Sequence, residues 1–260
     1  MKYFDAHTHL QFAAYDEDRE EVFARSREAG VGMNVVGTDR STSRAAIECA
    51  KIHEEVWASV GLHPTHSSEE VFDAAVYEAM AREEKVIAIG ECGLDYFRLD
   101  EETKEKQFET FVAHIEVANK VNKPLMLHIR SGKHGEVANS AYDDAVKLLQ
   151  THAKVLGDVH FFAGKWETAK KFLDLGFTLS FTGVVTFAQD YHDVVRNTPL
   201  DMLLTETDAP FVTPTPHRGR RNEPQYIPLI LQKIAQIKGL DEEVVRAQIL
   251  LNSTRVFGIA

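Results

Sequence analysis

The sequence has few cysteines, no long apolar stretch and no excess of positive charge. Its two cysteines, Cys49 and Cys92, are too few for a disulfide framework, and we expect them to be reduced thiols in a cytoplasmic protein. No run of about 18 uncharged apolar residues occurs, so no membrane span is predicted. The N-terminal residues also lack the order of segments that marks a secretory signal. A formal net charge of −11 argues against attraction of nucleic acid over the whole surface.

The composition is that of one ordinary globular domain. Of 260 residues, 44% are hydrophobic and 27% are charged, which is typical of globular proteins. The length suits one (β/α)₈ barrel better than two separate domains. No low-complexity tract or linker interrupts the chain, so we treat residues 1–260 as a single domain. One local feature departs from the acidic average, the basic loop His217–Arg221.

Short apolar runs alternate with amphipathic stretches along the whole chain, which predicts strands that alternate with helices. The predicted strands are Tyr3–His9, Val31–Gly37, Val56–Leu62, Val86–Gly90, Pro124–Ile129, Asp158–Phe162, Phe177–Val185 and Leu203–Thr207. The predicted helices are Asp18–Ala29, Ser43–His53, one that opens at Ser68, Glu101–Val121, Ala141–Thr151, Trp166–Leu175, Tyr191–Arg196, Pro224–Lys238 and a closing helix Asp241–Phe257. Eight apolar strands in this order favour an α/β fold of the (β/α)₈ TIM-barrel type over an open doubly wound sheet.

Metal-type residues fall at the ends of the predicted strands. His7 and His9 close the first strand, and since side chains alternate along a strand, both imidazoles point to the same side. Such a pair is a common accident when it stands alone. The same placement recurs, however, at the ends of the third, fourth, fifth, sixth and eighth strands, in His63, Glu91, His128, His160, Glu206 and Asp208. The carboxyl ends of the strands form the active face of barrel enzymes, so these side chains are expected to converge there.

Burying so many polar groups at one end of a barrel costs several kcal/mol per ion unless something compensates them, and bound metal is the obvious compensation. Six of these side chains, the imidazoles of His7, His9, His128 and His160 and the carboxylates of Glu91 and Asp208, are enough for one or two divalent ions. Glu91 is the natural bridge because a carboxylate has two oxygens to share. The identity of the metal stays open among Mg, Mn and Zn; imidazole-rich ligation suits Zn, Mn, Fe or Ni and is poor for Mg alone.

The chain resembles the TatD family of metal-dependent hydrolases, within the amidohydrolase-like barrel enzymes. Nine segments carry the resemblance in family order: Phe4–Leu10, Gly61–Pro64, Gly90–Phe97, Pro124–Arg130, His160–Gly164, Ser180–Phe187, Leu203–Pro214, Arg221–Pro224 and Asn252–Phe257. The resemblance implies a divalent-metal-dependent deoxyribonuclease with DNA as its substrate. One departure is Phe161, where the family often has a small residue or cysteine; we expect it to change the shape of the pocket more than the chemistry.

The resemblance also implies roles for particular residues. His7, His9, Glu91 and Asp208 would hold a first metal ion, and Glu91, His128 and His160 a second. His63 and Glu206 match positions in the family's active site, where they would contact phosphate or water, so the candidate catalytic residues are Asp208, Glu206 and His63. From its charge, Asp208 is expected to act as general base on the attacking water and to return the proton to the leaving oxygen.

Three arginines are candidates for binding the substrate. Arg130 lies two residues beyond His128 and so points to the same side, where it could pair with a phosphate; a structural salt bridge is an equal alternative. Arg220 and Arg221 could follow a nucleic-acid backbone, or could simply form a solvated loop. The residues just past Glu91, Asp95 to Phe97, are expected to pack in the pocket wall. His66 and His134 lie in loops on the active face and receive no role.

Other readings of the same residues stay open. A D-aminoacyl-tRNA deacylase or a hydrolase of small esters or amides would use the same fold and ligands. Glu91 stands where some barrel hydrolases carry a carbamylated lysine, which argues against those relatives. A non-catalytic barrel would be expected to have lost a ligand, and the sequence has lost none. No obligate protein partner is inferred.

Overall fold

Eight parallel strands, each hydrogen-bonded to the next one along the chain, form the centre of the molecule. The computed structural model describes residues 1–97, 101–132 and 140–259. The strands are β1 (Tyr3–Thr8), β2 (Val31–Val36), β3 (Val56–Val60), β4 (Val86–Asp95), β5 (Leu125–Arg130), β6 (Gly157–His160), β7 (Thr178–Phe181) and β8 (Leu203–Thr205). A parallel bridge between Thr8 and Ala209 brings β1 next to the end of β8. The sheet therefore curls into a nearly closed barrel, and the predicted (β/α)₈ architecture is confirmed.

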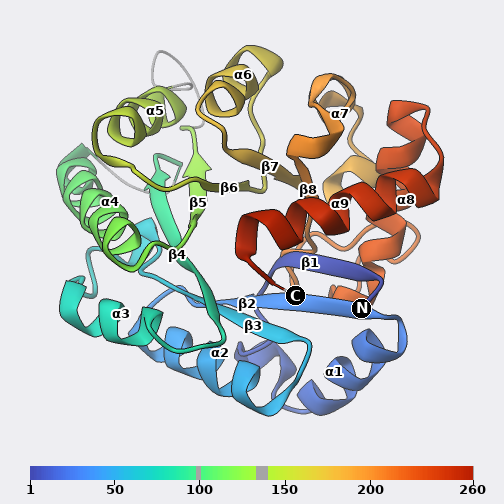
Figure 1. Cartoon of the computed structure of the whole chain (residues 1–260), viewed down its shortest axis with the longest axis horizontal. Coiled ribbons are helices and arrows are strands. Elements are labelled where there is room, and N and C mark those ends of the chain that lie inside the picture. The colour runs from blue at the N-terminus through green and yellow to red at the C-terminus, as the bar shows by residue number, and fades with distance from the viewer. Residues whose placement is uncertain (98–100, 133–139, 260) are drawn as a thin grey trace.

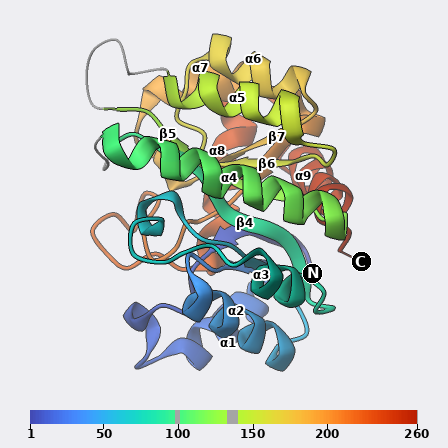
Figure 2. The ribbon, with the colours of Figure 1, turned by 90° about the vertical axis from the view of Figure 1, so that its left-hand side faces the viewer.

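Helices follow the strands and form the outer layer (Figure 1). The α-helices are α1 (Arg19–Glu28), α2 (Arg40–Ile52), α3 (Ala74–Ala81), α4 (Glu101–Val121), α5 (Ser140–His152), α6 (Trp166–Asp174), α7 (His192–Asn197), α8 (Ile227–Lys238) and α9 (Glu242–Phe257). Short 3₁₀ turns are η1 (Ala13–Tyr15), η2 (Pro64–His66), η3 (Gly183–Thr186), η4 (Gln189–Tyr191), η5 (Leu200–Met202) and η6 (Pro224–Tyr226). The view turned by 90° shows α4 lying along β4 (Figure 2).

The predicted helix opening at Ser68 is wrong. The backbone N–H groups of Glu69 and Glu70 both donate to the carbonyl of His66, which completes a turn after η2 instead of starting a helix. The helix α3 begins six residues later, at Ala74, where the Asp73 side chain accepts hydrogen bonds from two free backbone N–H groups. An acidic N-cap satisfies orphan donors in this way, so the start of this helix follows its cap.

Two strand ends differ from the prediction by more than two residues. The strand β4 extends through Asp95 rather than ending at Gly90, and its pairing with β5 shifts register between Ile89 and Cys92. The strand β7 ends at Phe181, and the next segment, predicted as strand, is the turn η3, which the Thr182 hydroxyl caps. The longer β4 matters for function because it places Glu91 and Asp95 on one rigid element.

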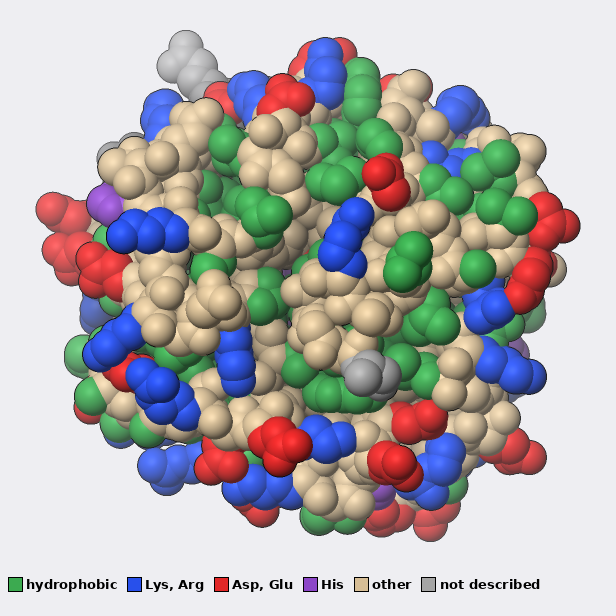
Figure 3. Space-filling view, in the orientation of Figure 1, with side chains coloured by type: hydrophobic (Ala, Val, Ile, Leu, Met, Phe, Trp, Pro, Cys, Tyr) green, Lys and Arg blue, Asp and Glu red, His purple; other side chains and the backbone are tan. Residues whose placement is uncertain are grey.

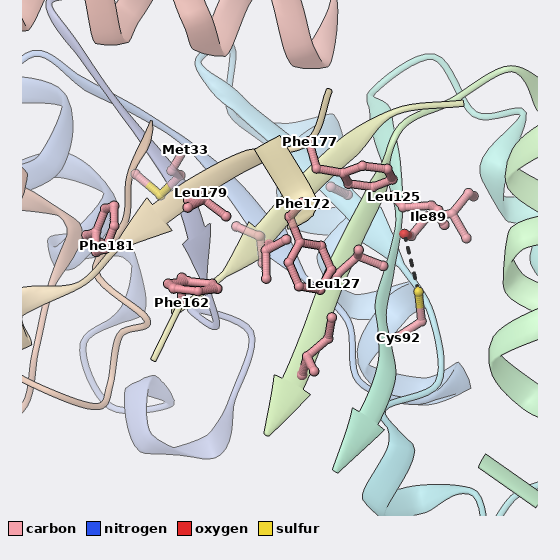
Figure 4. Packing of buried hydrophobic residues seen from close by; sticks show 14 of the residues in the cluster. Met33, Ile89, Cys92, Leu125, Leu127, Phe162, Phe172, Phe177, Leu179 and Phe181 are labelled. Carbon is pink, nitrogen blue, oxygen red and sulfur yellow. Dashed lines mark hydrogen bonds between the residues drawn. The ribbon is translucent and has the colours of Figure 1, made fainter. Parts of the chain in front are cut away.

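The main core lies between the strands and the surrounding helices. Figure 4 shows Phe162, Phe172 and Phe177 packed with Leu127 and Leu179 in this layer. Cys92 is fully buried in the same layer. A second cluster joins the barrel strands to the C-terminal segment; it comprises Phe4, Ala6, Val36, Ile87, Ala88, Met126, Leu204, Phe257 and Ile259.

The second cluster lies one layer below the candidate ligands. Met126 and Leu204 each stand two residues before a candidate site residue, His128 and Glu206, so alternation along the strand directs each pair to the same face. The Phe257 ring at the end of α9 lies 5.9 Å from the Phe4 ring. The closing helix predicted at the C-terminus therefore contributes an apolar floor beneath the polar end of the barrel.

The exterior mixes charges of both signs. On the face seen in Figure 1, Lys and Arg side chains alternate with Asp and Glu side chains, with apolar side chains between them (Figure 3). This face presents no continuous basic surface, in keeping with the net charge of −11. None of the described helices has both the length and the apolar character needed to cross a bilayer.

Candidate metal centre

A buried carboxylate joins the end of β1 to the end of β8. Asp5 accepts hydrogen bonds from the N–H groups of His7 (3.2 Å) and Thr207 (2.8 Å) and from the Thr207 hydroxyl (2.5 Å). The N–H of Asp208 donates to the carbonyl of His7 at 2.9 Å. These bonds hold His7 and Asp208 side by side, although they come from opposite ends of the chain.

A first group of four side chains converges here. The Nε2 atoms of His7 and His9 lie 3.1 Å apart. The Oε2 atom of Glu91 lies 3.5 Å from His7 Nε2 and 3.7 Å from His9 Nε2. The Oδ1 atom of Asp208 lies 3.5 Å from His9 Nε2. The structure therefore brings together the four residues predicted for the first metal.

A second group meets the other oxygen of Glu91. Its Oε1 atom lies 2.8 Å from His128 Nδ1 and 3.6 Å from His160 Nε2. His63 Nε2 approaches the same oxygen at 3.4 Å. The two carboxylate oxygens of Glu91 thus face two different sets of imidazoles, which is the arrangement that a bridging ligand needs.

The spacing and chemistry of these atoms fit a divalent cation. For metal–nitrogen bonds of about 2.0–2.1 Å, the ligand atoms of a tetrahedral ion stand about 3.3 Å apart, close to the separations in the first group. His9 Nδ1 lies 2.8 Å from the Val36 carbonyl, so it carries the proton and leaves the Nε2 lone pair directed at the cluster. Mixed imidazole and carboxylate donors suit Zn or Mn better than Mg.

The electrostatics keep the acids ionised. Burial disfavours the Glu91 carboxylate, but the imidazoles of His63 and His7 and a hydrogen bond from His128 hold its pKa well below the usual range. Burial likewise opposes ionisation of Asp208, yet the contact with His9 and the charge on His160 lower its pKa. Both groups are therefore carboxylates at neutral pH, as ligands for a cation must be.

Glu206 lies behind His160, away from the cavity. Its Oε1 atom is 2.9 Å from His160 Nδ1 and accepts the N–H of Phe161 at 2.7 Å, and its Oε2 accepts the Ser180 hydroxyl at 2.6 Å. Burial opposes protonation of His160, but Glu206 raises its pKa to about 10. The expectation that Glu206 contacts phosphate or water needs correction, because both of its oxygens are occupied inside the barrel. Its position is that of a residue that orients His160.

Asp95 lies in the pocket wall, as expected from the sequence, but its contact with a candidate metal ligand was not predicted. It lines the cavity, and its Oδ2 atom lies 3.1 Å from His128 Nε2. Its Oδ1 accepts the N–H of Phe97 at 2.8 Å, so the carboxylate is held in place. Asp95 stands four residues after Glu91 in what proves to be one strand, and alternation would have placed both on the same face. The signal was hidden by the early end predicted for β4.

Two histidines of the segment after β3, His63 and His66, reach the cavity. The pKa of His63 falls to about 4 because it is buried and stands beside His128, so its imidazole is neutral. Its Nδ1 accepts the N–H of Thr65 at 3.2 Å, which fixes the ring. His66 also lines the cavity, with Nδ1 at 3.1 Å from the Thr38 carbonyl. His134 lies outside the described residues.

The three candidate arginines occupy different places. Arg130 is exposed, lines the cavity, and stacks its guanidinium 3.8 Å from the centre of the Phe97 ring. Arg220 is exposed and is not among the described residues of the cavity wall. Arg221 is turned inward, with two 2.7 Å bonds to Asp18 and a 3.3 Å ion pair to Glu223. Of the three, the structure brings Arg130 to the candidate ligands.

The metal-type residues form the floor of a cavity at the carboxyl ends of the strands. Its volume is about 630 Å³, within the range of small-ligand sites. The apolar and aromatic part of its wall comprises Phe12, Ile129, Phe161, Ala163, Tyr191, Phe211 and Val212. The site can therefore hold a group that is anionic at one end and apolar at the other.

Comparisons with known proteins find relatives that match nearly the whole chain. The profile of the family described as TatD related DNase matches residues 4–258. The Bacillus subtilis protein named uncharacterized metal-dependent hydrolase YabD is 38% identical, over 98% of this chain and 99% of its own length. The Pantoea ananatis protein named 3'-5' ssDNA/RNA exonuclease TatD is 33% identical, over 98% and 99%.

A solved structure supports the fold independently. The crystal structure of YjjV, a TatD homolog from Escherichia coli K12, superposes with a TM-score of 0.87 and covers 100% of this chain and 99% of its own. Because the sequence identity is only 24%, this structure supports the fold alone. The evidence for the family comes from the profile and the two relatives.

Proposed function

Because the chain belongs to the family of TatD-related DNases, and so to the metal-dependent hydrolases, we propose that it hydrolyses phosphodiester bonds of DNA. The observation that carries the proposal is Glu91, whose two oxygens face two groups of imidazoles in a cavity that Arg130 also lines. Paired cations and one guanidinium suit a phosphodiester, which carries one negative charge. The name of the Pantoea relative makes single-stranded RNA a second substrate to test.

The two groups of side chains around the oxygens of Glu91 would each hold one metal ion. His7, His9, Glu91 and Asp208 would hold one divalent ion, and Glu91 with His128 and His160 the other. When bound, such ions polarise the phosphoryl group and make water more acidic. Zn and Mn suit these donors better than Mg alone.

The remaining chemistry belongs to the chain itself. Asp208 takes a proton from the water that attacks phosphorus, and a new P–O bond forms as the bond to the leaving nucleoside oxygen breaks. Asp208 then returns the proton to that oxygen. Arg130 binds a phosphate oxygen through the edge of its guanidinium, while its face stays on Phe97. Neutral His63 faces the same space and donates a hydrogen bond to the phosphate.

The test is a nuclease assay on end-labelled single- and double-stranded DNA with Mg, Mn or Zn. Asp208→Asn is expected to lower kcat about 10²- to 10⁴-fold, the usual contribution of a general base. Glu167→Gln, an exposed acidic residue on α6, is the matched control and should retain full activity. Wild-type turnover by Asp208→Asn would contradict the assignment.

The alternative substrates are outcomes of the same assay. Parallel reactions with D-aminoacyl-tRNA and with small esters or amides use the same protein and metals. Rapid deacylation without cleavage of DNA or RNA would replace the nuclease proposal with the deacylase one, because a metal centre alone does not choose the electrophile. The cytoplasmic location predicted from the sequence stays a prediction.

A further inference from the structure

One wall of the cavity ends in an aromatic ring that is half exposed to solvent. Phe211 is 51% exposed, and among the large apolar side chains exposed in the described part of the chain it is the one that lines the cavity. Single exposed apolar side chains are ordinary on a protein surface. Phe211, however, lies beside the candidate metal ligands and on the loop that also carries Asp208, which suggests a role in binding.

The backbone that carries this ring is firmly held. The N–H of Phe211 donates to the carbonyl of Asp208 at 2.8 Å, and its carbonyl accepts a 2.6 Å bond from the side chain of Asn222. Asn222 is fully buried and also binds the carbonyl of Thr207 at 2.8 Å. The ring is therefore presented to the cavity on a fixed turn, and little conformational freedom would be lost when a ligand covers it.

Phe211 stands close to the first metal group. The centre of the Phe211 ring lies 6.4 Å from the centre of the His9 ring, whose Nε2 faces the first metal group. In a nucleotide a single sugar separates the phosphate from the base, so a phosphate over the metal group brings a base to the level of Phe211. Arg130 lines the same cavity and supplies a guanidinium for the phosphate.

We propose that Phe211 is a stacking platform for an unpaired base next to the scissile phosphate. The inference rests on the proposed nuclease function and adds a base-binding residue to it: the ring would stack on a base whose face is free, as in a single strand. Stacking of a base on an aromatic side chain contributes about 1–3 kcal/mol and tolerates every base. In a duplex the same face is covered by the neighbouring base pairs, so the base would first have to leave the stack.

The test compares one phosphodiester with and without bases. The substrates are the dinucleotide dTpT and the same diester in which hydrogen replaces both thymines, each hydrolysed by metal-loaded full-length protein. For the wild type, kcat/KM is expected to be about 5- to 150-fold higher on dTpT, the equivalent of one stacked base. Phe211→Ala should lose this factor on dTpT and match the wild type within about twofold on the abasic diester, and Phe211→Trp should restore it.

The controls separate stacking from other effects. Phe187, another exposed ring (42%), is not among the described residues of the cavity wall, and Phe187→Ala should keep the wild-type preference for dTpT. Metal content and Tm of Phe211→Ala are measured alongside. Equal loss on both diesters, or no loss on either, would overturn the stacking role while leaving the nuclease function intact. Failure of the wild type to cleave either diester with any metal would instead reject the nuclease function, and the stacking role with it.

Discussion

At the scale of single residues, the site depends on carboxylates that each serve two neighbours. Glu91 turns one oxygen to His7 and the other to His128. Behind His160, Glu206 places one oxygen next to His160 Nδ1, and its other oxygen accepts a hydrogen bond from the Ser180 hydroxyl. An imidazole that binds metal through one nitrogen needs its other nitrogen oriented, and outer carboxylates commonly do this.

Replacing Glu206 with Gln should weaken one of the two metal groups selectively. A Gln side chain keeps one acceptor oxygen but removes the negative charge that Glu206 holds 2.9 Å from His160 Nδ1, so the imidazole loses its charged partner. Loss of such an outer partner typically costs about 10- to 100-fold in metal affinity. Titration of the metal-free protein with Zn or Mn, followed by calorimetry, should show a weaker second binding step.

The first binding step is the internal reference for this variant. It involves His7, His9 and Asp208, none of which has a described contact with Glu206 within hydrogen-bond distance. Its affinity should change by less than about threefold, far below the 10- to 100-fold expected for an outer carboxylate. Equal weakening of both steps would mean that Glu206 supports the whole site rather than His160.

At the scale of elements, the segment after β8 is the one that assembles the site. It carries Asp208 and Phe211 and is tied back to the N-terminal part of the barrel. Tyr15 donates to the carbonyl of Asn222 at 2.6 Å, and Arg221 binds Asp18 through two 2.7 Å bonds. The basic loop that the sequence suggested for DNA binding therefore includes one arginine, Arg221, that instead links this segment to Asp18.

Asn222→Ala should impair catalysis through this segment. The substitution removes the donor shared by the carbonyls of Thr207 and Phe211, which flank Asp208. Each buried carbonyl left without a donor costs about 1–3 kcal/mol, and the freed turn no longer holds Asp208 at the centre. We expect a lower Tm together with a fall in kcat of at least about tenfold, since small displacements of catalytic groups reduce rates strongly. Thermal unfolding and the nuclease assay measure the two effects.

Asn119→Ala is the matched control for this variant. The Asn119 side chain also bonds twice to the backbone, to the carbonyl of His152 and the N–H of Lys154. It lies on α4 and is not among the described residues of the cavity wall. It should lower the Tm and leave kcat unchanged. If Asn222→Ala also keeps its kcat, Asn222 serves stability alone.

At the scale of the whole molecule, the fold and the strand-end residues could be predicted because both depend on local sequence pattern. Apolar runs alternating with amphipathic stretches require a parallel sheet covered by helices, so the barrel could be inferred strand by strand. Residues such as His128 and His160 could be inferred because each interrupts an apolar run. Alternation on a strand also placed Arg130 in the cavity.

What the sequence could not predict depends on partners far along the chain. Arg221 reads as a basic-loop residue, yet its partner Asp18 stands 203 positions earlier. Glu206 reads as an active-site acid because it precedes Asp208 by two residues, but contacts from Ser180 and Phe161 occupy it. The start of α3 was missed for a local reason: the N–H groups of Glu69 and Glu70 bond to the carbonyl of His66, and the helix begins only after Asp73.

The charge distribution of the whole molecule predicts a weak dependence of DNA binding on salt. The chain has a net charge of −11, and the cavity offers one described guanidinium, that of Arg130. For a single strand, each neutralised phosphate contributes about −0.7 to the slope of log affinity against log salt concentration. With one or two contacts, the slope for a labelled single-stranded oligonucleotide and metal-loaded Asp208→Asn protein should lie between about −0.7 and −1.4.

Arg130→Gln should make the slope shallower by about 0.7. Arg220→Gln changes an exposed side chain outside the described cavity wall and should not alter the slope. Fluorescence anisotropy between 50 and 200 mM NaCl, the span over which about 6–10 contacts would cost 10³- to 10⁵-fold, measures these slopes. A slope of about −4 or steeper would require a track of basic residues along the DNA, and a change of slope in Arg220→Gln would place the basic loop on that track.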